Sequence, residues 1–298
     1  MKRRLVKHGE ATMMISLPAK WLKKFNLNKG DELEVEEDES SLNIKLSGKE
    51  IKKEIALNLS TLEESSIRTL ISNSYRLGYD KILISFENED MFKIIKEVVE
   101  NSLIGFEIIK KDKKSCQIES ITEPSQDQFD NILSKIFMNI EELFNIIEDP
   151  KKMEEEDFKE IDKKIQQYSN FCRRVIIKRA SKTSIIEFSF HSNIIHATRE
   201  MNHLIRYLEK NKIRLDKSEL DFAKDAHNFY KSLQKSYQSK DIKLLEQLHK
   251  SEKELIYTKG YKYLEKSKNQ VVIYSLMTII KHFYLSTSPL MGFLISEK

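Results

Sequence analysis

The chain has 298 residues, a formal net charge of +4, and 40% hydrophobic and 33% charged residues. Its length permits two or three domains, and only seven glycines and four prolines favour a mostly helical protein. A net charge this small does not by itself indicate a nucleic-acid-binding protein. Cys116 and Cys172 stand far apart, so they predict neither a disulfide framework nor a zinc site, and we expect both to be small buried residues.

Export and membrane insertion are not predicted. The basic start lacks the following apolar run of a signal peptide. The most apolar stretch, Val271–Ile280, has about half of the ~20 residues that a membrane helix requires. We therefore expect a cytoplasmic protein without membrane insertion.

The first 46 residues predict two pairs of strands around a short helix. An apolar-alternating segment comes first, followed by a strand at 12–17 and a helix that begins at Pro18, which suits a first helical turn because it lacks an N–H. A turn at Gly30–Asp31 leads into strands at 33–35 and 42–46. Fewer than fifty residues bury too little surface to form a core alone, so this unit needs a partner or the rest of the chain.

Charge divides the same segment. Residues 1–24 hold seven basic side chains against Glu10, whereas residues 25–40 hold Lys29 against seven acids. The basic end is of the kind that a phosphate backbone attracts. The alternative is a solvated surface whose two poles offset each other.

Three motifs carry a resemblance: Leu5–Gly9, Ser16–Trp21 and Leu27–Asp31. Together they resemble the SpoVT/AbrB swapped-hairpin DNA-binding domain, in the form that archaeal regulators carry before a PhoU-like protein. The resemblance implies a homodimer in which two chains interlock into one barrel that binds double-stranded DNA. The DNA-binding residues that it implies are Lys2, Arg3, Arg4, Lys7, Thr12, Lys20 and Lys23. The family usually has a small turn between the first strands, and Glu10 departs from that pattern.

Residues 49–122 predict a small α/β domain in the order βαβαββ. Strands are expected at 54–59, 81–86, 106–109 and 116–121. A helix that starts near Ser60–Thr61 should end at Gly78, and a second, capped by Asp90, should run through Asn101. The domain either has a structural or dimerising role or holds a small ligand.

Residues 125–298 predict a bundle of six helices. Apolar residues at three- and four-residue steps indicate a first helix over 129–147, broken at Asp149–Pro150. The remaining helices are expected at 155–180, 184–211, 217–239, 241–266 and 269–295, with a kink at Pro289. Two three-helix repeats, about 125–212 and 215–298, form an up-down bundle.

This layout resembles the PhoU family of phosphate-uptake regulators. The family's repeats carry paired acids on their third helices, where Thr198, Asn202, Thr278 and His282 stand in this chain. Because this chain departs from the family's pattern at these positions, we expect no metal cluster of the family type and no cofactor. His196, Glu200 and His203 share one helix face and are either a transition-metal site or hydrogen-bonded boundary residues.

Two further clusters of side chains each allow two interpretations. Arg173, Arg174, Lys178 and Arg179 are either a solvated helix end or a site for an acidic partner or phosphate groups. Tyr257, Tyr261 and Tyr263, beside Lys259, Lys262 and Lys266, are expected to pack in the bundle, with base stacking as the alternative.

The fold class is mainly α with an N-terminal β part, in three domains: 1–48, 49–122 and 125–298. No catalytic motif occurs, and the acidic run 154–157 opens a helix, so we expect no enzyme. The function indicated is a DNA-binding transcriptional regulator of phosphate uptake whose bundle binds a signal or partner. Two alternatives remain: a signalling adaptor that docks on a phosphate transporter or kinase without DNA binding, and an antitoxin-like DNA-binding protein.

Overall fold

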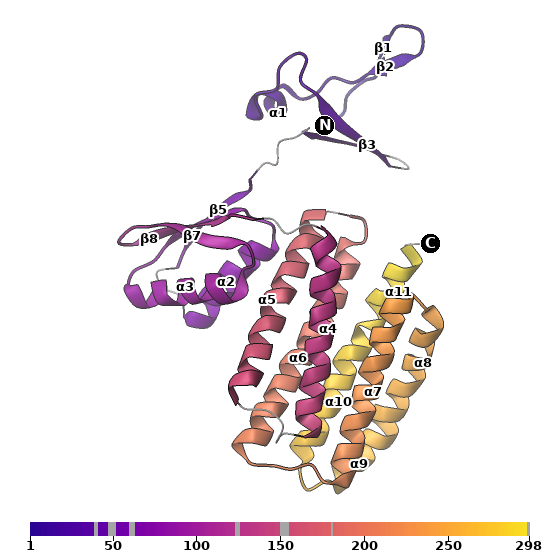
Figure 1. The fold of residues 1–298 in the computed structure, drawn as a ribbon. Helices are drawn as coiled ribbons and strands as arrows, with labels where there is room; N and C mark the ends of the chain where they lie inside the picture. The colour runs from indigo at the N-terminus through magenta and orange to yellow at the C-terminus, as the bar shows by residue number, and fades with distance from the viewer. Residues whose placement is uncertain are drawn as a thin grey trace. The chain divides into compact units, whose positions relative to one another are not determined.

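The computed structural model describes residues 1–38, 41–46, 52–59, 63–122, 126–149, 155–179 and 181–296, and the chain divides into two compact units, residues 1–51 and 52–298. In the first unit, β1 (Val6–His8) and β2 (Thr12–Met14) form a hairpin, α1 (Ala19–Lys24) follows, and β3 (Leu33–Asp38) pairs with β4 (Ser41–Leu46) (Figure 1). The predicted order of strands and helix is confirmed. Pro18 lies one residue before α1, and its carbonyl accepts from the N–H groups of Trp21 and Leu22.

The second unit begins with a four-stranded sheet in the order β5-β6-β8-β7. The elements are β5 (Glu54–Asn58), α2 (Glu64–Arg76), β6 (Lys81–Ser85), α3 (Glu89–Ser102), β7 (Phe106–Lys111) and β8 (Ser115–Ser120). β5 and β6 are parallel and the other pairs antiparallel, and both helices cover one face of the sheet (Figure 1). The predicted βαβαββ order is confirmed.

The expected cap of α3 is wrong. Asn88 precedes this helix with an extended backbone, and its side chain accepts from the N–H of Met91 at 3.0 Å. Asp90 lies inside the first turn and pairs with Lys93 instead. Both Asn and Asp suit a cap, and the position with non-helical backbone decides between them.

Long helices form most of the second unit. They are α4 (Gln126–Glu148), α5 (Glu155–Arg179), α6 (Ser184–Lys210), α7 (Lys217–Ser239), α8 (Ile242–Lys253), the π-helix η2 (Glu254–Gly260), α9 (Tyr261–Lys266), α10 (Gln270–Leu285) and α11 (Thr287–Ser296). The chain is thus a small N-terminal strand region followed by a mostly helical body (Figure 1). The predicted helices matching α4 to α7 are confirmed, whereas the PhoU-like repeats stay a prediction.

The single helix predicted over 241–266 is interrupted by η2. The turns of a π-helix are wider than those of an α-helix, and η2 ends at Gly260, where neighbouring atoms lie close to the backbone. A Cβ on Gly260 would lie 2.8 Å from the carbonyl oxygen of Leu255 and 3.0 Å from Met277 of α10. The absent side chain lets η2 approach α10.

The single helix predicted over 269–295 is also divided, at Ser286. Pro289 lies in the first turn of α11 and has no N–H to offer the carbonyl of Leu285. That carbonyl accepts instead from the side-chain amide of Asn193 on α6, at 3.0 Å. The proline was therefore correctly expected to disturb this helix.

Each layer of the second unit has an apolar core. The α/β layer buries Tyr75, Ile82, Ile84, Ile95 and Ile118, among others. The helical layer buries aromatic side chains that include Phe144, Phe171, Phe222, Tyr230 and Phe283. Cys116 and Cys172 are free and buried, as predicted. No helix among the described residues is both long and apolar enough to cross a membrane.

Some predicted features lie outside the described residues. They are the helix start at Ser60–Thr61, the helix break at Pro150, the domain boundary near Pro124, and Glu154 of the acidic run.

Candidate functional site

The predicted DNA-binding residues are all exposed on the N-terminal unit. Lys2, Arg3 and Arg4 precede β1, in a segment without regular structure. In the described part of this unit their charges have no ion-pair partner within 4 Å, and the same holds for Lys7. Four cations therefore face solvent within seven residues, which is a favourable arrangement for contacts with phosphates.

The register of the first hairpin separates two of the predicted residues. Lys7 lies opposite Met13, and Thr12 lies opposite His8. Because side chains alternate between the faces of a strand pair, Lys7 and Thr12 point to opposite faces of the hairpin. Gly9, at a φ of +74°, begins the turn that joins the strands, and Glu10 lies in that turn.

The two remaining predicted residues share the exposed side of α1. Lys20 and Lys23 are one helical turn apart, while Trp21 and Phe25 are half-buried and pack edge-to-face with ring centroids 5.5 Å apart. The helix therefore presents two cations and keeps its aromatic side chains toward the unit.

The turn after α1 is fixed by local hydrogen bonds. The N–H of Asn28 donates to the carboxylate of Asp31 at 2.7 Å, and Gly30 has a φ of +100°, which favours glycine. This is the Leu27–Asp31 motif, and its residue types suit the turn that they form.

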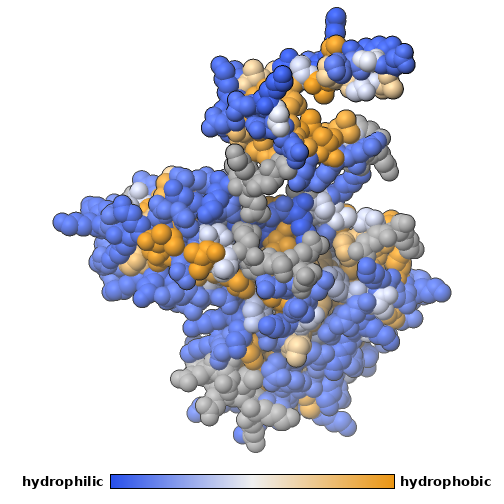
Figure 2. All heavy atoms as spheres, turned by 45° about the horizontal axis from the view of Figure 1, so that its top comes forward, coloured by the Kyte–Doolittle hydropathy of each residue, from blue (hydrophilic) through white to orange (hydrophobic). Residues whose placement is uncertain are grey.

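The second hairpin has one apolar and one charged face. Leu33, Val35 and Glu37 lie opposite Leu46, Ile44 and Leu42, so Glu37 is the charged exception on the apolar face, and the alternate positions carry Glu34 and Glu36. Val35 and Leu42 are 59% and 64% exposed, and apolar side chains are visible on the surface of this unit in Figure 2. None of residues 1–37 and 41–46 is buried, so the described part of the unit has no core of its own.

The basic cluster on α5 is not a solvated helix end, and that expectation is wrong. Arg174 is 3% exposed, bonds to the carboxylate of Asp80 at 2.5 Å, and donates to the carbonyls of Tyr75 and Tyr79. Lys178 also reaches Asp80, at 3.1 Å. The cause is that this half of α5 packs against α2 and α3, so Arg174 and Lys178 join the two layers of the unit.

The residues weighed as metal ligands do not come together. His196 and His203 are exposed, and the ring of His196 stacks on His282 of α10 with centroids 5.6 Å apart. Across the described residues, no three His, Cys, Asp or Glu side chains are grouped so that they could hold a metal ion. Thr198 donates to the carbonyl of Ile195, Asn202 to Asp162, and Thr278 to the carbonyl of Tyr274.

The three tyrosines differ in their surroundings. Tyr263 packs on Phe222 at the edge of the helical core, as expected. Tyr257 and Tyr261 are exposed and pack edge-to-face on each other, so bundle packing is wrong for these two. They are four residues apart, on the outer side of η2 and α9.

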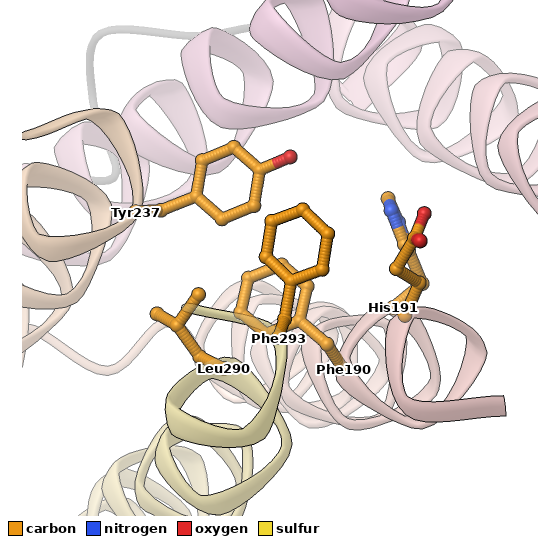
Figure 3. A pocket seen from close by; sticks show the side chains of 6 residues that line it. Phe190, His191, Tyr237, Leu290 and Phe293 are labelled. Atoms are coloured by element: carbon orange, nitrogen blue, oxygen red, sulfur yellow. The ribbon is translucent and has the colours of Figure 1, made fainter. Parts of the chain in front are cut away.

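A cleft of about 670 Å³ lies between the ends of α4, α5, α6, α7 and α11. Its apolar lining includes Phe129, Phe137, Tyr237 and Phe293, and Figure 3 shows the adjoining pocket, where Tyr237 and Phe293 lie close to Leu290, Phe190 and His191. Arg179 and Glu187 add charges at this cleft. No local sequence pattern predicts this cleft, because it is assembled from the ends of five helices.

Comparison with known proteins identifies the N-terminal segment. Residues 11–54 match the family described as "Antidote-toxin recognition MazE, bacterial antitoxin". No curated protein and no solved structure matches the chain. The N-terminal segment is thus a MazE/AbrB-like, antitoxin-type domain, in agreement with the resemblance noted from the sequence.

Proposed function

We propose that the protein is a dimeric, DNA-binding transcriptional regulator. The observation that carries the proposal is a MazE/AbrB-like match over residues 11–54 that is directly preceded by an exposed basic segment. In this proposal Lys2, Arg3, Arg4 and Lys7 contact phosphates, and Lys20 and Lys23 flank them from α1. Phosphate contacts hold a protein on DNA and leave sequence readout to other groups, such as Thr12.

Dimerisation belongs to the same proposal. The exposed apolar face of β3 and β4 supports it, since a second copy would remove Val35 and Leu42 from water. Two copies would also double the number of cations that face one DNA duplex. In this proposal the protein is cytoplasmic, and it catalyses no reaction.

The helical body is proposed to bind the signal or the protein partner. Its PhoU-like arrangement, and with it a role in phosphate uptake, rests on the order and length of the helices in the sequence. The cleft between the helix ends offers a place for a ligand of drug-like size, because its volume lies in the range of small-molecule pockets.

A second candidate function is that of an antitoxin. The description of the matched family favours it, because that description names toxin recognition. A DNA-binding antitoxin would use the same N-terminal domain, and its toxin would be a second protein bound by this chain. A small toxin gene beside this one would favour the antitoxin, and phosphate-transport genes would favour the regulator.

The proposal is tested by changing two exposed arginines in the full chain. Arg3→Ala with Arg4→Ala should weaken binding to a duplex taken from upstream of the gene. The slope of log affinity against log salt should become shallower by about 0.9 for each phosphate that the variant no longer neutralises. Fluorescence anisotropy over a series of salt concentrations measures both quantities.

The matched control removes the same charge elsewhere. Lys224→Ala with Lys235→Ala takes two exposed cations from α7 and should leave affinity and slope nearly unchanged. If the arginine variant binds DNA as the unchanged protein does, the basic segment is not the DNA interface. The adaptor, in which this domain only dimerises, would then be the better account.

A further inference from the structure

Three arginines from three helices gather where α2 meets the helical layer: Arg76 of α2, Arg173 of α5 and Arg199 of α6. Arg76 donates from Nε to the side-chain oxygen of Asn170 at 2.8 Å, and Asn170 lies one turn before Arg173. The three charges are close enough to repel one another, since Arg76 and Arg199 both disfavour the charged form of Arg173. The result is a local concentration of positive charge.

Arg173 is buried within this cluster. It is 7% exposed, its guanidinium lies 5.3 Å from the ring centre of Phe188, and its Nε has no hydrogen-bond acceptor among the described residues. Ser169, one turn earlier on the same face of α5, is 1% exposed, and its hydroxyl likewise finds no partner there. Two buried donors therefore lie side by side without acceptors, an arrangement that usually costs stability.

The next residue, Arg174, is an arginine whose positive charge is compensated. Arg174 has the carboxylate of Asp80 and two backbone carbonyls. Over the part of the chain that the structure describes, no carboxylate pairs with Arg76, Arg173 or Arg199. Asp162 is near enough to feel the charge of Arg199, but its oxygens bond to Asn202 and Arg206.

The cluster keeps its charge at neutral pH. Burial, and then the repulsion from Arg199, lowers the pKa of Arg76 to about 10, and burial with repulsion from Arg76 and Arg199 does the same for Arg173. Both values remain far above 7, so both side chains stay protonated. An uncompensated buried cation is expensive, and an anion that binds beside it would offset that cost.

We propose that Arg76, Arg173, Ser169 and Arg199 form a binding site for a phosphate group, either free or as a small phosphate ester. A phosphate offers several acceptor oxygens and up to two negative charges, and guanidinium groups bind such oxyanions with paired hydrogen bonds. Arg199 is exposed, whereas Arg173 and Ser169 are buried, so Arg199 is the member of the site that solvent reaches. Because the site joins α2 to α5 and α6, the ligand fastens the α/β layer to the helical layer.

The site does not depend on DNA binding by the N-terminal domain, and it is tested separately. Titration calorimetry and thermal unfolding of the full chain are run with inorganic phosphate, and with chloride at equal ionic strength. We expect saturable binding of phosphate and a rise of the unfolding temperature with its concentration. A parallel titration with glycerol 3-phosphate distinguishes a phosphate ester from free phosphate as the preferred ligand.

Arg199→Gln is the first variant, because an exposed side chain can be changed without loss of the fold. Loss of its charged hydrogen bonds should weaken phosphate binding by about ten- to a hundredfold. Arg206→Gln is the matched control: it removes the same charge from the same helix, where Arg206 is exposed and faces Asp162. Equal weakening by both variants, or no saturable binding of either ligand, overturns the proposal.

Arg173→Met separates binding from a structural role. If Arg173 serves the ligand, the methionine variant loses the rise in unfolding temperature with phosphate and keeps its unfolding temperature in chloride, because an uncompensated buried charge has gone. If this variant still gains stability from phosphate but is less stable in chloride, Arg173 only supports the packing around Phe188, and the proposal is wrong.

Discussion

His191 is a titratable side chain buried in the helical layer. It lines the pocket of Figure 3, with Phe129 and Phe190 edge-to-face on its ring at 5.9 and 5.6 Å. Burial, assisted by Arg173 and Arg179, lowers the pKa of His191 to about 3. The imidazole is therefore neutral in the folded protein over most of the acid range.

This residue predicts a loss of stability in acid. Below about pH 6.5 the unfolded chain takes up a proton on His191, while the folded protein does so only near pH 3. Stability should therefore fall by about 1.4 kcal/mol for each pH unit between these limits. His191→Leu removes the titration and should lose about 2 kcal/mol less between about pH 7 and pH 5.

Urea unfolding of the helical layer at both pH values measures this difference. The unchanged protein and the variant share every other titrating group, so only the difference between their pH dependences is assigned to His191. Equal losses in both proteins would show that the imidazole is protonated in the fold.

At the scale of elements, α5 is fastened to the α/β layer by charge as well as by packing. The guanidinium of Arg174 lies over the rings of Tyr75 and Phe106, 5.1 and 4.8 Å from their centres. It also donates a hydrogen bond to the carboxylate of Asp80. Asp80 is 8% exposed in its side chain and also accepts from the backbone N–H of Lys53. Both side chains of the pair are buried, and Lys178 shares the same carboxylate, so loss of Asp80 would remove the one negative charge that these two cations contact together.

Asp80→Asn should therefore lower the stability of the second unit by about 3 kcal/mol or more, the usual cost of breaking a buried pair. Asp90→Asn is the control in the same layer: Asp90 is 85% exposed and pairs with Lys93 at the surface, so its loss should cost far less stability than the loss of Asp80. Hydrogen exchange of α2 and α5 should rise in the first variant. Similar stability in both variants would mean that Asp80 carries little of the interaction between the layers.

The same elements show which features of the fold can be predicted from the sequence alone. Apolar residues spaced three and four apart are a local property of a single helix, so this pattern predicted α4 to α7 closely. The partner of Arg174 stands 94 residues away. No local pattern marks Asp80 as that partner, so from the sequence the basic run on α5 stays open between a solvated helix end and a site for an acidic partner or phosphate groups. Hydrophobic periodicity did not predict η2 either, because the close approach of Gly260 to Met277 involves a second helix that no local pattern reveals.

Among the candidate sites, those carried by residue type and order were accessible from sequence. The strand and turn motifs of the first 46 residues pointed to the domain that the comparison supports. The arginine cluster and the cleft were not accessible, since each is built from side chains of three or more helices. Their residues become neighbours only through the packing of the second unit.

At the scale of the whole molecule, the two units differ in what they can stabilise alone. The second unit has two apolar cores, whereas the described part of the first has no buried side chain. The apolar face of β3 and β4 would leave Val35 and Leu42 in water in a monomer. We therefore expect the full chain to dimerise through this unit and a chain that begins at Lys52 to be monomeric.

Val35→Gln tests the position of that interface in the full chain. Burying a valine contributes about 1.5 kcal/mol, and a symmetric dimer buries two copies, so the dimer should weaken roughly a hundredfold. Glu34→Gln is the matched control, because Glu34 is the preceding residue and lies on the opposite, charged face of the hairpin. Sedimentation equilibrium should show the control dimerising as the unchanged protein does. If Val35→Gln also dimerises unchanged, the two chains meet elsewhere, and the exposed face of β3 and β4 needs another partner.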